Sequence, residues 1–398
     1  MKKPLYLNAL GIGASLGFGK DAIAPQLFSG TRETLRPDDD FLPGRTVFLG
    51  AVDHPLPALP AAFSCFDSRN NRLLAVLLSE IEAETTAAMR RYGPDRIAIV
   101  LGTSTSGLAE GEAAVATRMA TGQWPSAFDY RQQELGSPAT FAARWLGTEG
   151  PAYVIATACS SSAKVFASAR RLIAAGFCDA AVVGGVDTLC RMTVAGFSAL
   201  ESLSAERCNP FSANRDGITI GEGGAVFLMT REPSEIALLG IGETSDAHHL
   251  SAPDPEGKGA LDAMRTALAD AGLDAGEIDY VNLHGTATSL NDAMESTAVA
   301  TLFGDKVACS STKAMTGHTL GAAGAIEAAF LWLTLHPRFN PGGQLPPHLW
   351  DGVVDPALAP LRLATAADRL PDRSKVAALS NSFAFGGSNC SLVLGRGW

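Results

Sequence analysis

One cysteine stands where the chain could hold a nucleophile. Cys159 lies in residues 157–162, Thr-Ala-Cys-Ser-Ser-Ser, directly after a short apolar run and before a stretch of helical character that Gly176 would end. A thiol at a helix N-terminus lies at the positive end of the helix dipole, which lowers its pKa and raises the fraction of reactive thiolate. We therefore predict a nucleophilic thiol here. The alternative that the residues leave open is an inert buried cysteine.

Two histidines occupy similar strand-to-helix transitions. His284 opens residues 284–288, His-Gly-Thr-Ala-Thr, and His318 closes residues 311–318 just before a helix of small residues. Side chains at the carboxyl ends of strands can project into the cleft at that edge of a sheet. Either histidine alone would more often be structural. In a chain with a poised cysteine, the pair predicts a catalytic set of one thiol and two imidazoles.

Metal binding is the weaker interpretation of the histidines. The chain offers no pair of ligands on one helical face, and the adjacent His248 and His249 would point in diverging directions in a helix or a strand. The sequence therefore predicts no metal site.

A glycine-containing segment near the C-terminus could supply backbone donors. Residues 381–389 read Asn-Ser-Phe-Ala-Phe-Gly-Gly-Ser-Asn, which combines two aromatic residues with glycines that permit close approach of the backbone. Such a loop could line an oxyanion site. A hairpin-like turn between two core strands is the alternative that the composition leaves open.

The elements that must position these residues alternate along the chain. Short apolar runs rich in β-branched residues, at 97–101, 180–183 and 280–283, alternate with longer Ala-rich segments of helical character. Most of these runs are continuously apolar, as strands are in a sheet that helices cover on both faces. The pattern predicts an α/β fold with buried sheets.

A faint internal repeat relates residues 153–159 to residues 280–286, since each is a strand that ends in small polar residues and leads into a helical stretch. The repeat suggests two similar halves. The charged segment around Pro233 is the expected crossing point, which divides the chain into residues 1–235 with Cys159 and residues 236–398 with His284 and His318.

Composition excludes several classes of protein. The net charge of -10 and the pI near 5.2 disfavour nucleic-acid binding, which needs clustered Lys and Arg. Seven cysteines without a CxxC pair fit a reducing compartment. Glycines at 11, 13, 17 and 19 interrupt the apolar N-terminal stretch, and no apolar run reaches the roughly 18 residues of a membrane span. We expect a cytoplasmic protein without membrane insertion.

Taken together and in this order, residues 156–162, 284–288, 313–318 and 381–389 resemble the motifs of the elongating β-ketoacyl-acyl-carrier-protein synthases. The resemblance spans nearly the whole chain. It implies a thiolase-like fold of two similar halves in five α/β/α/β/α layers, and decarboxylative Claisen condensation of an acyl thioester with malonyl-carrier protein. Initiating synthases and plant-type polyketide synthases carry asparagine where this chain has His318, so an elongating enzyme is favoured.

The resemblance also implies roles for individual residues. Cys159 would be the nucleophile, the backbone N–H groups of Cys159 and Phe385 would hold the thioester oxyanion, and His284 and His318 would assist decarboxylation. Substrates would arrive on the phosphopantetheine of acyl carrier protein, with no bound cofactor. Lys313, Glu327 and Glu295 would support the histidines, and Thr286 and Thr288 would contact pantetheine. The substrate pocket would contain Phe197, Phe383 and, from across a dimer interface, Thr105, and Phe385 would gate access to the cysteine. Arg69 and Arg72 would dock the carrier protein.

Some features leave the substrate and the partner open. Ser289-Leu290-Asn291 replaces the family's usual Pro-x-Gly, and Ile218 stands where an aromatic gate residue is frequent. Residues 160–164 and 208–214 resemble synthases of aryl-polyene and related pathways, so the product could be a fatty acid, a polyketide or a polyene. The family's dimer could be a homodimer or a heterodimer with a chain-length-factor-like homologue. Ordinary solvent-exposed arginines remain an alternative for Arg69 and Arg72.

Two other functions compete with the synthase. A thiolase-like acyltransferase that uses coenzyme A would place a second catalytic cysteine in a C-terminal Gly-rich motif, whereas Cys390 follows Asn389. A non-catalytic or chain-length-determining partner subunit would lack the nucleophile that Cys159 provides. The sequence therefore favours the synthase.

Overall fold

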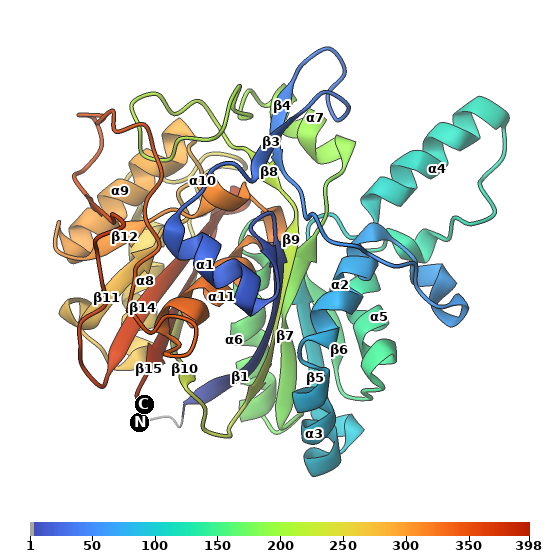
Figure 1. The fold of residues 1–398 in the computed structure, drawn as a ribbon, viewed down its shortest axis with the longest axis horizontal. Helices are drawn as coiled ribbons and strands as arrows, with labels where there is room; N and C mark the ends of the chain where they lie inside the picture. Colours follow the sequence, from blue (N-terminus) through green and yellow to red (C-terminus); the bar gives the residue numbers. More distant parts are fainter. Residues whose placement is uncertain (1–3) are drawn as a thin grey trace.

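Buried strands form two half-sheets with the same internal order (Figure 1). The computed structural model describes residues 4–398, and within them twelve strands form one mixed sheet. The N-terminal half has the order β1-β9-β7-β5-β6, and the C-terminal half has the order β10-β15-β14-β11-β12, followed by β13. The strands are β1 (Leu5–Ala14), β2 (Gly17–Phe18), β5 (Ile97–Gly102), β6 (Ala152–Ile155), β7 (Ala180–Asp187), β9 (Gly223–Thr230), β10 (Ile236–Ser245), β11 (Ile278–Asn282), β12 (Ala308–Ser310), β13 (Arg362–Leu363), β14 (Val376–Ala384) and β15 (Ser388–Arg396).

The two half-sheets meet at a short junction. Within residues 4–398, β1 pairs with β10 antiparallel through two residue pairs, Leu5↔Leu238 and Tyr6↔Ala237. A separate small sheet of β3 (Leu35–Asp38), β4 (Val47–Gly50) and β8 (Ile220–Gly221) lies above them. The apolar runs expected to be strands at 97–101, 180–183 and 280–283 form β5, β7 and β11, and every residue of β5 and β7 is buried.

Helices cover both half-sheets and fill the space between them. α6 packs on β5 and β7, α11 packs on β14 and β9, and the two helices contact each other in the middle of the molecule. α2 and α5 cover the outer face of the N-terminal half, and α8 and α9 cover that of the C-terminal half. The helices are α1 (Lys20–Ser29), α2 (Arg69–Ser79), α3 (Glu82–Tyr92), α4 (Leu108–Thr121), α5 (Ser137–Leu146), α6 (Ser161–Ala174), α7 (Arg191–Ala199), α8 (Lys258–Ala271), α9 (Ser289–Phe303), α10 (Lys313–Thr316) and α11 (Ala323–Leu335). The predicted five-layered α/β fold is confirmed.

The internal symmetry differs from the repeat found in the sequence. β5 and β11 hold the same place in the two strand orders, and β6 and β12 hold the next place towards the edge. The counterpart of the turn after β6 is therefore the turn before α11, and residues 280–286 correspond to the end of β5. Short buried strands with small polar ends occur several times in one α/β chain. A match of seven residues therefore related β6 to β11, although β12 is the strand that corresponds to β6 in the strand order.

Two further features concern the surface. Figure 1 shows α4 and the segment after it extending away from the body of the molecule. Among the helices of residues 4–398, none is both long and apolar enough to cross a membrane.

Candidate active site

The turn after β6 holds Cys159 in a strained backbone. Ala158 has φ 51°, a left-handed conformation that is costly for a residue with a side chain. Ser161, the first residue of α6, braces the turn, because its hydroxyl accepts from the N–H of Thr157 at 2.9 Å and donates to the carbonyl of Ala158 at 2.6 Å. The sulfur is thereby presented at the N-terminus of α6.

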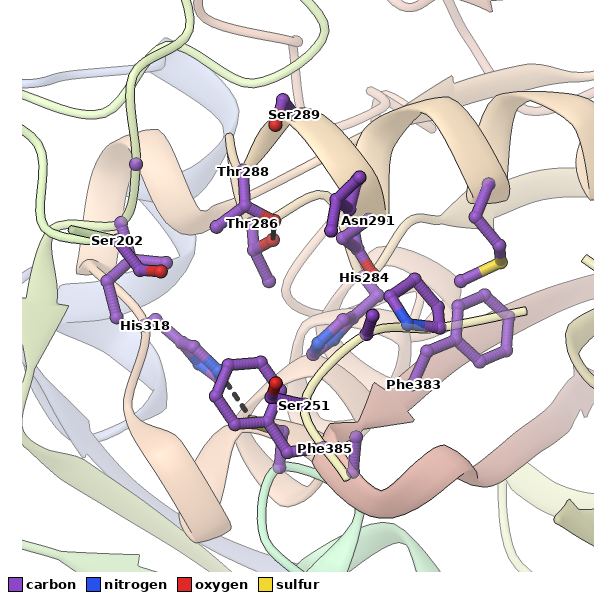
Figure 2. Close-up of a pocket in the computed structure, with 18 of the residues that line it drawn as sticks. Ser202, Ser251, His284, Thr286, Thr288, Ser289, Asn291, His318, Phe383 and Phe385 are labelled. Carbon is purple, nitrogen blue, oxygen red and sulfur yellow. Dashed lines mark hydrogen bonds between the residues drawn. The ribbon is translucent and has the colours of Figure 1, made fainter. Parts of the chain in front are cut away.

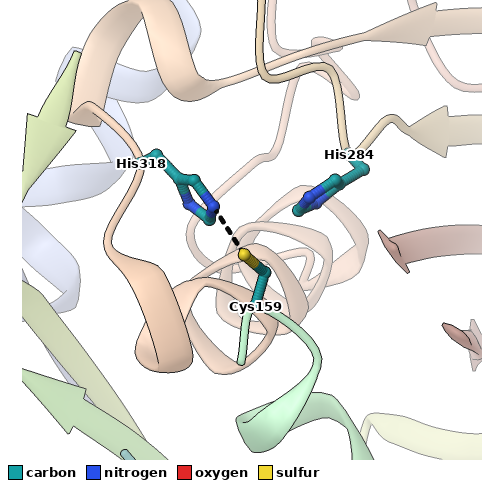
Figure 3. A group of neighbouring side chains, drawn as sticks. All are labelled: Cys159, His284 and His318. Carbon is teal, nitrogen blue, oxygen red and sulfur yellow. Dashed lines mark hydrogen bonds between the residues drawn. The ribbon is translucent and has the colours of Figure 1, made fainter. Parts of the chain in front are cut away.

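The structure brings the three predicted catalytic side chains together (Figure 3). Sγ of Cys159 lies 3.0 Å from Nε2 of His318, and one ring nitrogen of His284 completes a group of atoms that all lie within 4.8 Å of one another. The two imidazole rings meet edge to face, with centroids 5.4 Å apart. All three residues are buried, so the group lies out of bulk water.

β8 and the residue before it hold His318 in place. The N–H of His318 donates to the carbonyl of Thr219 at 2.6 Å, and the N–H of Gly221 donates to the carbonyl of His318 at 3.0 Å. Gly221 is required because a Cβ there would lie 2.1 Å from the carbonyl oxygen of Thr316. Sequence reasoning missed this support, because Thr219 and Gly221 lie about a hundred positions before His318 in the chain.

Two buried carboxylates and one ammonium position His284. Glu295 accepts from the backbone N–H of His284 at 2.8 Å and of Gly285 at 2.7 Å. Nζ of Lys313 donates to the carbonyl of His284, lies 3.3 Å from its Nδ1, and forms a buried ion pair with Glu327. An ammonium beside Nδ1 makes that nitrogen the acceptor, which leaves the proton on Nε2. His284 therefore offers an N–H to the cavity, whereas a metal ion would need the lone pair of that nitrogen.

Burial dominates the protonation of the group. Loss of solvent raises the pKa of the Cys159 thiol to about 11, although the Lys313 charge and the backbone N–H groups of Cys159 and Phe385 act in the opposite direction. The expectation that the helix terminus would lower this pKa is therefore wrong. Burial, followed by the charge of Lys313, lowers the pKa of both histidines well below its usual value. At neutral pH the site holds a thiol beside a neutral imidazole that can accept its proton.

A cavity of about 300 Å³ opens over these side chains (Figure 2). Figure 2 shows both histidines facing it, and the ring of Phe383 lies edge to face with that of His284, with centroids 6.2 Å apart. The ring of Phe385 lies 5.9 Å from that of Phe197, and the hydroxyls of Thr286 and Thr288 are 3.0 Å apart. These predicted substrate residues line the cavity, as does Ile218, together with the polar residues Ser202, Ser251 and Asn291, which sequence reasoning did not identify as site residues.

Residues 381–389 form the hairpin-like turn that the sequence allowed, and the oxyanion site stays a prediction. They connect β14 and β15 as a hairpin through a short 3₁₀ turn, η6 (Phe385–Gly387), in which the N–H of Phe385 interacts with Sγ of Cys159. Gly386 and Gly387 have φ 79° and 69°, which permits the tight turn. The N–H of Asp246 donates to the carbonyl of Gly387 at 2.9 Å, so the loop after β10 anchors this turn.

Thr105 lies outside the lining of this cavity. Its hydroxyl donates to Asp187 at 2.7 Å and accepts from the N–H of Thr188 at 3.2 Å. Asp187 also accepts from Thr103 and from the N–H of Ala322, which ties the turn after β5 to the start of the segment leading into α11. A contribution of Thr105 to a substrate pocket across a dimer interface stays a prediction. Within this chain its side chain hydrogen-bonds to Asp187.

The two arginines expected to dock a carrier protein are engaged in internal ion pairs. Arg69 forms a two-pronged contact with the buried carboxylate of Glu222, and Arg72 forms one with Asp67. Their side chains are 41% and 34% exposed, so the surface still reaches them. Docking stays a prediction, and a carrier protein would have to share these arginines with the two carboxylates.

The chain matches two family models that describe the halves of one kind of protein. The model "Beta-ketoacyl synthase, N-terminal domain" matches residues 71–234, and "Beta-ketoacyl synthase, C-terminal domain" matches residues 236–345. The fold and the buried cysteine with two histidines define a thiolase-like condensing-enzyme class. Within it, the chain belongs to the β-ketoacyl synthase family.

Curated relatives agree with this family. The chain is 39% identical over 268 residues to the mitochondrial 3-oxoacyl-[acyl-carrier-protein] synthase of Arabidopsis thaliana, covering 62% of this chain and 57% of the relative. It is 38% identical over 270 residues to 3-oxoacyl-[acyl-carrier-protein] synthase 2 of Rhizobium meliloti (strain 1021), covering 62% of this chain and 61% of that protein. The matches thus span less than two thirds of these relatives.

Solved structures match over nearly the full chain. The ketosynthase ApeO of Xenorhabdus doucetiae, solved in complex with its chain length factor ApeC, is 47% identical to this chain and has a TM-score of 0.93. The match covers 99% of this chain and 98% of the ApeO chain. The ishigamide ketosynthase/chain length factor is 26% identical with a TM-score of 0.87, and both chains are covered completely.

Proposed function

We propose that this chain is a β-ketoacyl-acyl-carrier-protein synthase that extends an acyl chain by decarboxylative condensation with malonyl-carrier protein. The observation that carries the proposal is the contact between Sγ of Cys159 and Nε2 of His318 beside the N–H of His284, at one buried cavity. Membership of the β-ketoacyl synthase family supports the same chemistry.

Acyl transfer uses the thiol and one imidazole. As Sγ of Cys159 attacks the carbonyl carbon of an acyl thioester, the thiol proton passes to Nε2 of His318, 3.0 Å away. The backbone N–H groups of Cys159 and Phe385 stabilise the oxyanion. When the C–S bond to pantetheine breaks, the leaving thiolate takes the proton from His318. The products are the acyl-enzyme, a free carrier thiol and a neutral histidine.

Condensation uses both imidazoles as donors. Once Cys159 is acylated it has no thiol proton to give, and the neutral ring of His318 can carry its single proton on Nε2 in place of Nδ1. The thioester carbonyl of malonyl-carrier protein then accepts from the Nε2–H groups of His284 and His318. Breaking the bond to the carboxylate releases carbon dioxide and leaves its electron pair in an enolate, whose charge these donors stabilise. The enolate carbon bonds to the acyl carbonyl, and the C–S bond to Cys159 breaks. The resulting thiolate takes up a proton to restore the resting enzyme.

Two alternatives receive less support. A coenzyme A-dependent acyltransferase would need a second catalytic cysteine, yet Cys390 is buried within β15 and does not line the cavity. A non-catalytic partner subunit would not need the arrangement of Cys159, His284 and His318. No cofactor enters the proposed reaction, because both acyl groups arrive on phosphopantetheine.

The partner that we propose is a chain-length-factor-like homologue. The 47% identical ketosynthase was solved with its chain length factor. In this chain, the protruding α4 and the segment after it expose large apolar side chains that a partner would cover. These side chains are Val115, Met119, Trp124, Tyr130 and Leu135. A second copy of the chain is the alternative partner, and the mass of the assembly would distinguish a homodimer from a heterodimer.

The sequence resemblance around Cys159 supports a polyene or related product. We place its synthesis in the cytoplasm.

Carbon dioxide release and chain extension from malonyl-carrier protein test the proposal together. The wild-type chain, with its partner where it requires one, should do both. Cys159→Gln should lose extension and retain decarboxylation, because the histidines and backbone donors remain. Extension by Cys159→Ala at the wild-type rate, or acyl transfer to coenzyme A without carbon dioxide release, would overturn it.

A further inference from the structure

A third histidine lies buried behind the active site, outside the cavity lining. His348 is 6% exposed and belongs to the segment between α11 and β13. Its Nδ1 accepts from the backbone N–H of Ser311 at 3.1 Å, and its Nε2 lies 3.0 Å from the carbonyl oxygen of Pro210. A backbone N–H can only donate and a carbonyl can only accept, so both partners select the neutral ring with its proton on Nε2.

The two partners of His348 reach both sides of the loop that carries His284. The hydroxyl of Ser311 donates to the carbonyl of Gly285 at 2.7 Å, one residue after His284. Pro210 precedes Phe211, and the N–H of Phe211 donates to a carboxylate oxygen of Asp292 at 2.8 Å. The other oxygen of Asp292 accepts from the N–H of Ala287 at 3.2 Å.

This loop needs external support. Gly285, Ala287 and the neighbouring Phe211 have φ 43°, 65° and 61°, and a left-handed backbone at residues with side chains persists only where its surroundings fix it. The packing is close, because a Cβ on Gly285 would lie 2.5 Å from Cβ of Ser311 and 3.0 Å from the Phe211 ring. A shift of Ser311 or Phe211 would therefore move the backbone next to His284.

We propose that His348 is a positioning residue for the decarboxylation step, which it serves by bracing residues 284–288 from two sides so that Nε2–H of His284 meets the malonyl carbonyl. The inference rests on the proposed function. Acyl transfer uses Cys159 and His318, and the backbone of His318 is held by Thr219 and Gly221, so acyl transfer depends less on this brace than decarboxylation does. Burial, with a smaller effect of Arg32, lowers the pKa of His348 to about 4, although its bond to Pro210 acts in the opposite direction, so the ring is neutral at pH 7.

The test separates the two half-reactions in full-length variants. His348→Phe keeps the ring shape and removes both hydrogen bonds, whereas His348→Asn keeps an acceptor near the position of Nδ1. His336→Phe is the matched control, because His336 packs against Trp332 with ring centroids 4.4 Å apart and lies outside the cavity lining. We expect His348→Phe to slow carbon dioxide release about tenfold or more while acyl transfer onto Cys159 stays within about twofold, and His348→Asn to recover part of the loss. Equal losses in both half-reactions, or full decarboxylation by His348→Phe, would overturn the inference.

A spectroscopic readout keeps the inference testable independently of activity and of how the variants fold. In ¹⁵N-histidine spectra of the wild-type chain at pH 7, His348 should show a protonated Nε2 and an unprotonated Nδ1. In His348→Phe the His284 signals should shift, whereas His336→Phe should leave them in place. A protonated Nδ1 on His348 contradicts the brace. A wild-type chain that releases no carbon dioxide overturns the proposed function, and these spectra then still decide whether His348 holds the loop.

Discussion

The ammonium of Lys313 lies 3.3 Å from Nδ1 of His284. This contact decides which nitrogen of His284 carries the proton and therefore what the ring can do in the cavity. With Nδ1 as acceptor, Nε2–H is a donor, as the proposed stabilisation of an enolate requires. Glu327 neutralises the buried ammonium and so makes its position tolerable.

Lys313→Met should impair decarboxylation more than acyl transfer. Without the ammonium, the tautomer of His284 is no longer fixed, and the carboxylate of Glu327 is left buried without its partner. We expect carbon dioxide release to fall about a hundredfold, and Lys313→Met combined with Glu327→Leu to recover folding but not the rate. Single-turnover measurement of each half-reaction checks this. The exposed Lys306→Met is the matched control, and a wild-type decarboxylation rate in Lys313→Met would contradict the role assigned to the ammonium.

Alkylation of Cys159 should remain slow at neutral pH. The pKa of its thiol is raised to about 11, so the thiolate fraction should increase about tenfold for each pH unit between pH 7 and pH 10. Peptide mapping after timed iodoacetamide treatment gives the rate at this cysteine alone. A plateau below pH 8 would show that the helix terminus, and not burial, controls the thiol.

The two histidines that we propose to be catalytic should differ in the half-reactions that depend on them. His318 touches Sγ and can take its proton, so His318→Ala should slow acyl transfer as well as decarboxylation, each by about a hundredfold. His284→Ala should slow decarboxylation by a similar factor and leave acyl transfer within about twofold. Acyl transfer at the wild-type rate in His318→Ala would mean that another group accepts the thiol proton.

Asp187→Ala should destabilise the fold more than its loss of volume explains. The buried carboxylate accepts from Thr103, from Thr105 and from the N–H of Ala322, and alanine would leave these donors unpaired. We expect the free energy of unfolding in urea to fall by about 3 kcal/mol or more. Asp187→Asn keeps one acceptor oxygen and should cost less, and Thr105→Val should cost about 1 kcal/mol. A loss below about 1 kcal/mol in Asp187→Ala would contradict this account.

The grouping of the three proposed catalytic side chains could be predicted because each belongs to a short segment with its own local signal. Cys159, His284 and His318 each stand between an apolar run and a helical stretch, and the edge of a sheet brings such positions together. The layered α/β fold could be predicted from the same alternation.

The supporting residues could not be predicted because their partners are distant in the chain. Glu222 and Arg69 are 153 residues apart, and His348 and Pro210 are 138 residues apart. A lone acid or histidine in a loop carries no local pattern that indicates such a partner. The direction of the Cys159 pKa shift was missed for a related reason, since the extent of burial depends on packing from both halves.

The proposed site is shared between halves whose sheets meet, in the part of the chain that the structure describes, through two residue pairs. Cys159 comes from the first half, whereas His284, His318 and the Phe385 N–H come from the second. When only the first half of the chain has been synthesised, Cys159 therefore has neither its proposed proton acceptor nor the complete set of proposed oxyanion donors. In the proposed mechanism, Cys159 becomes competent only after residue 385 has been synthesised and the second half has folded, so the order of translation itself delays the reactive state.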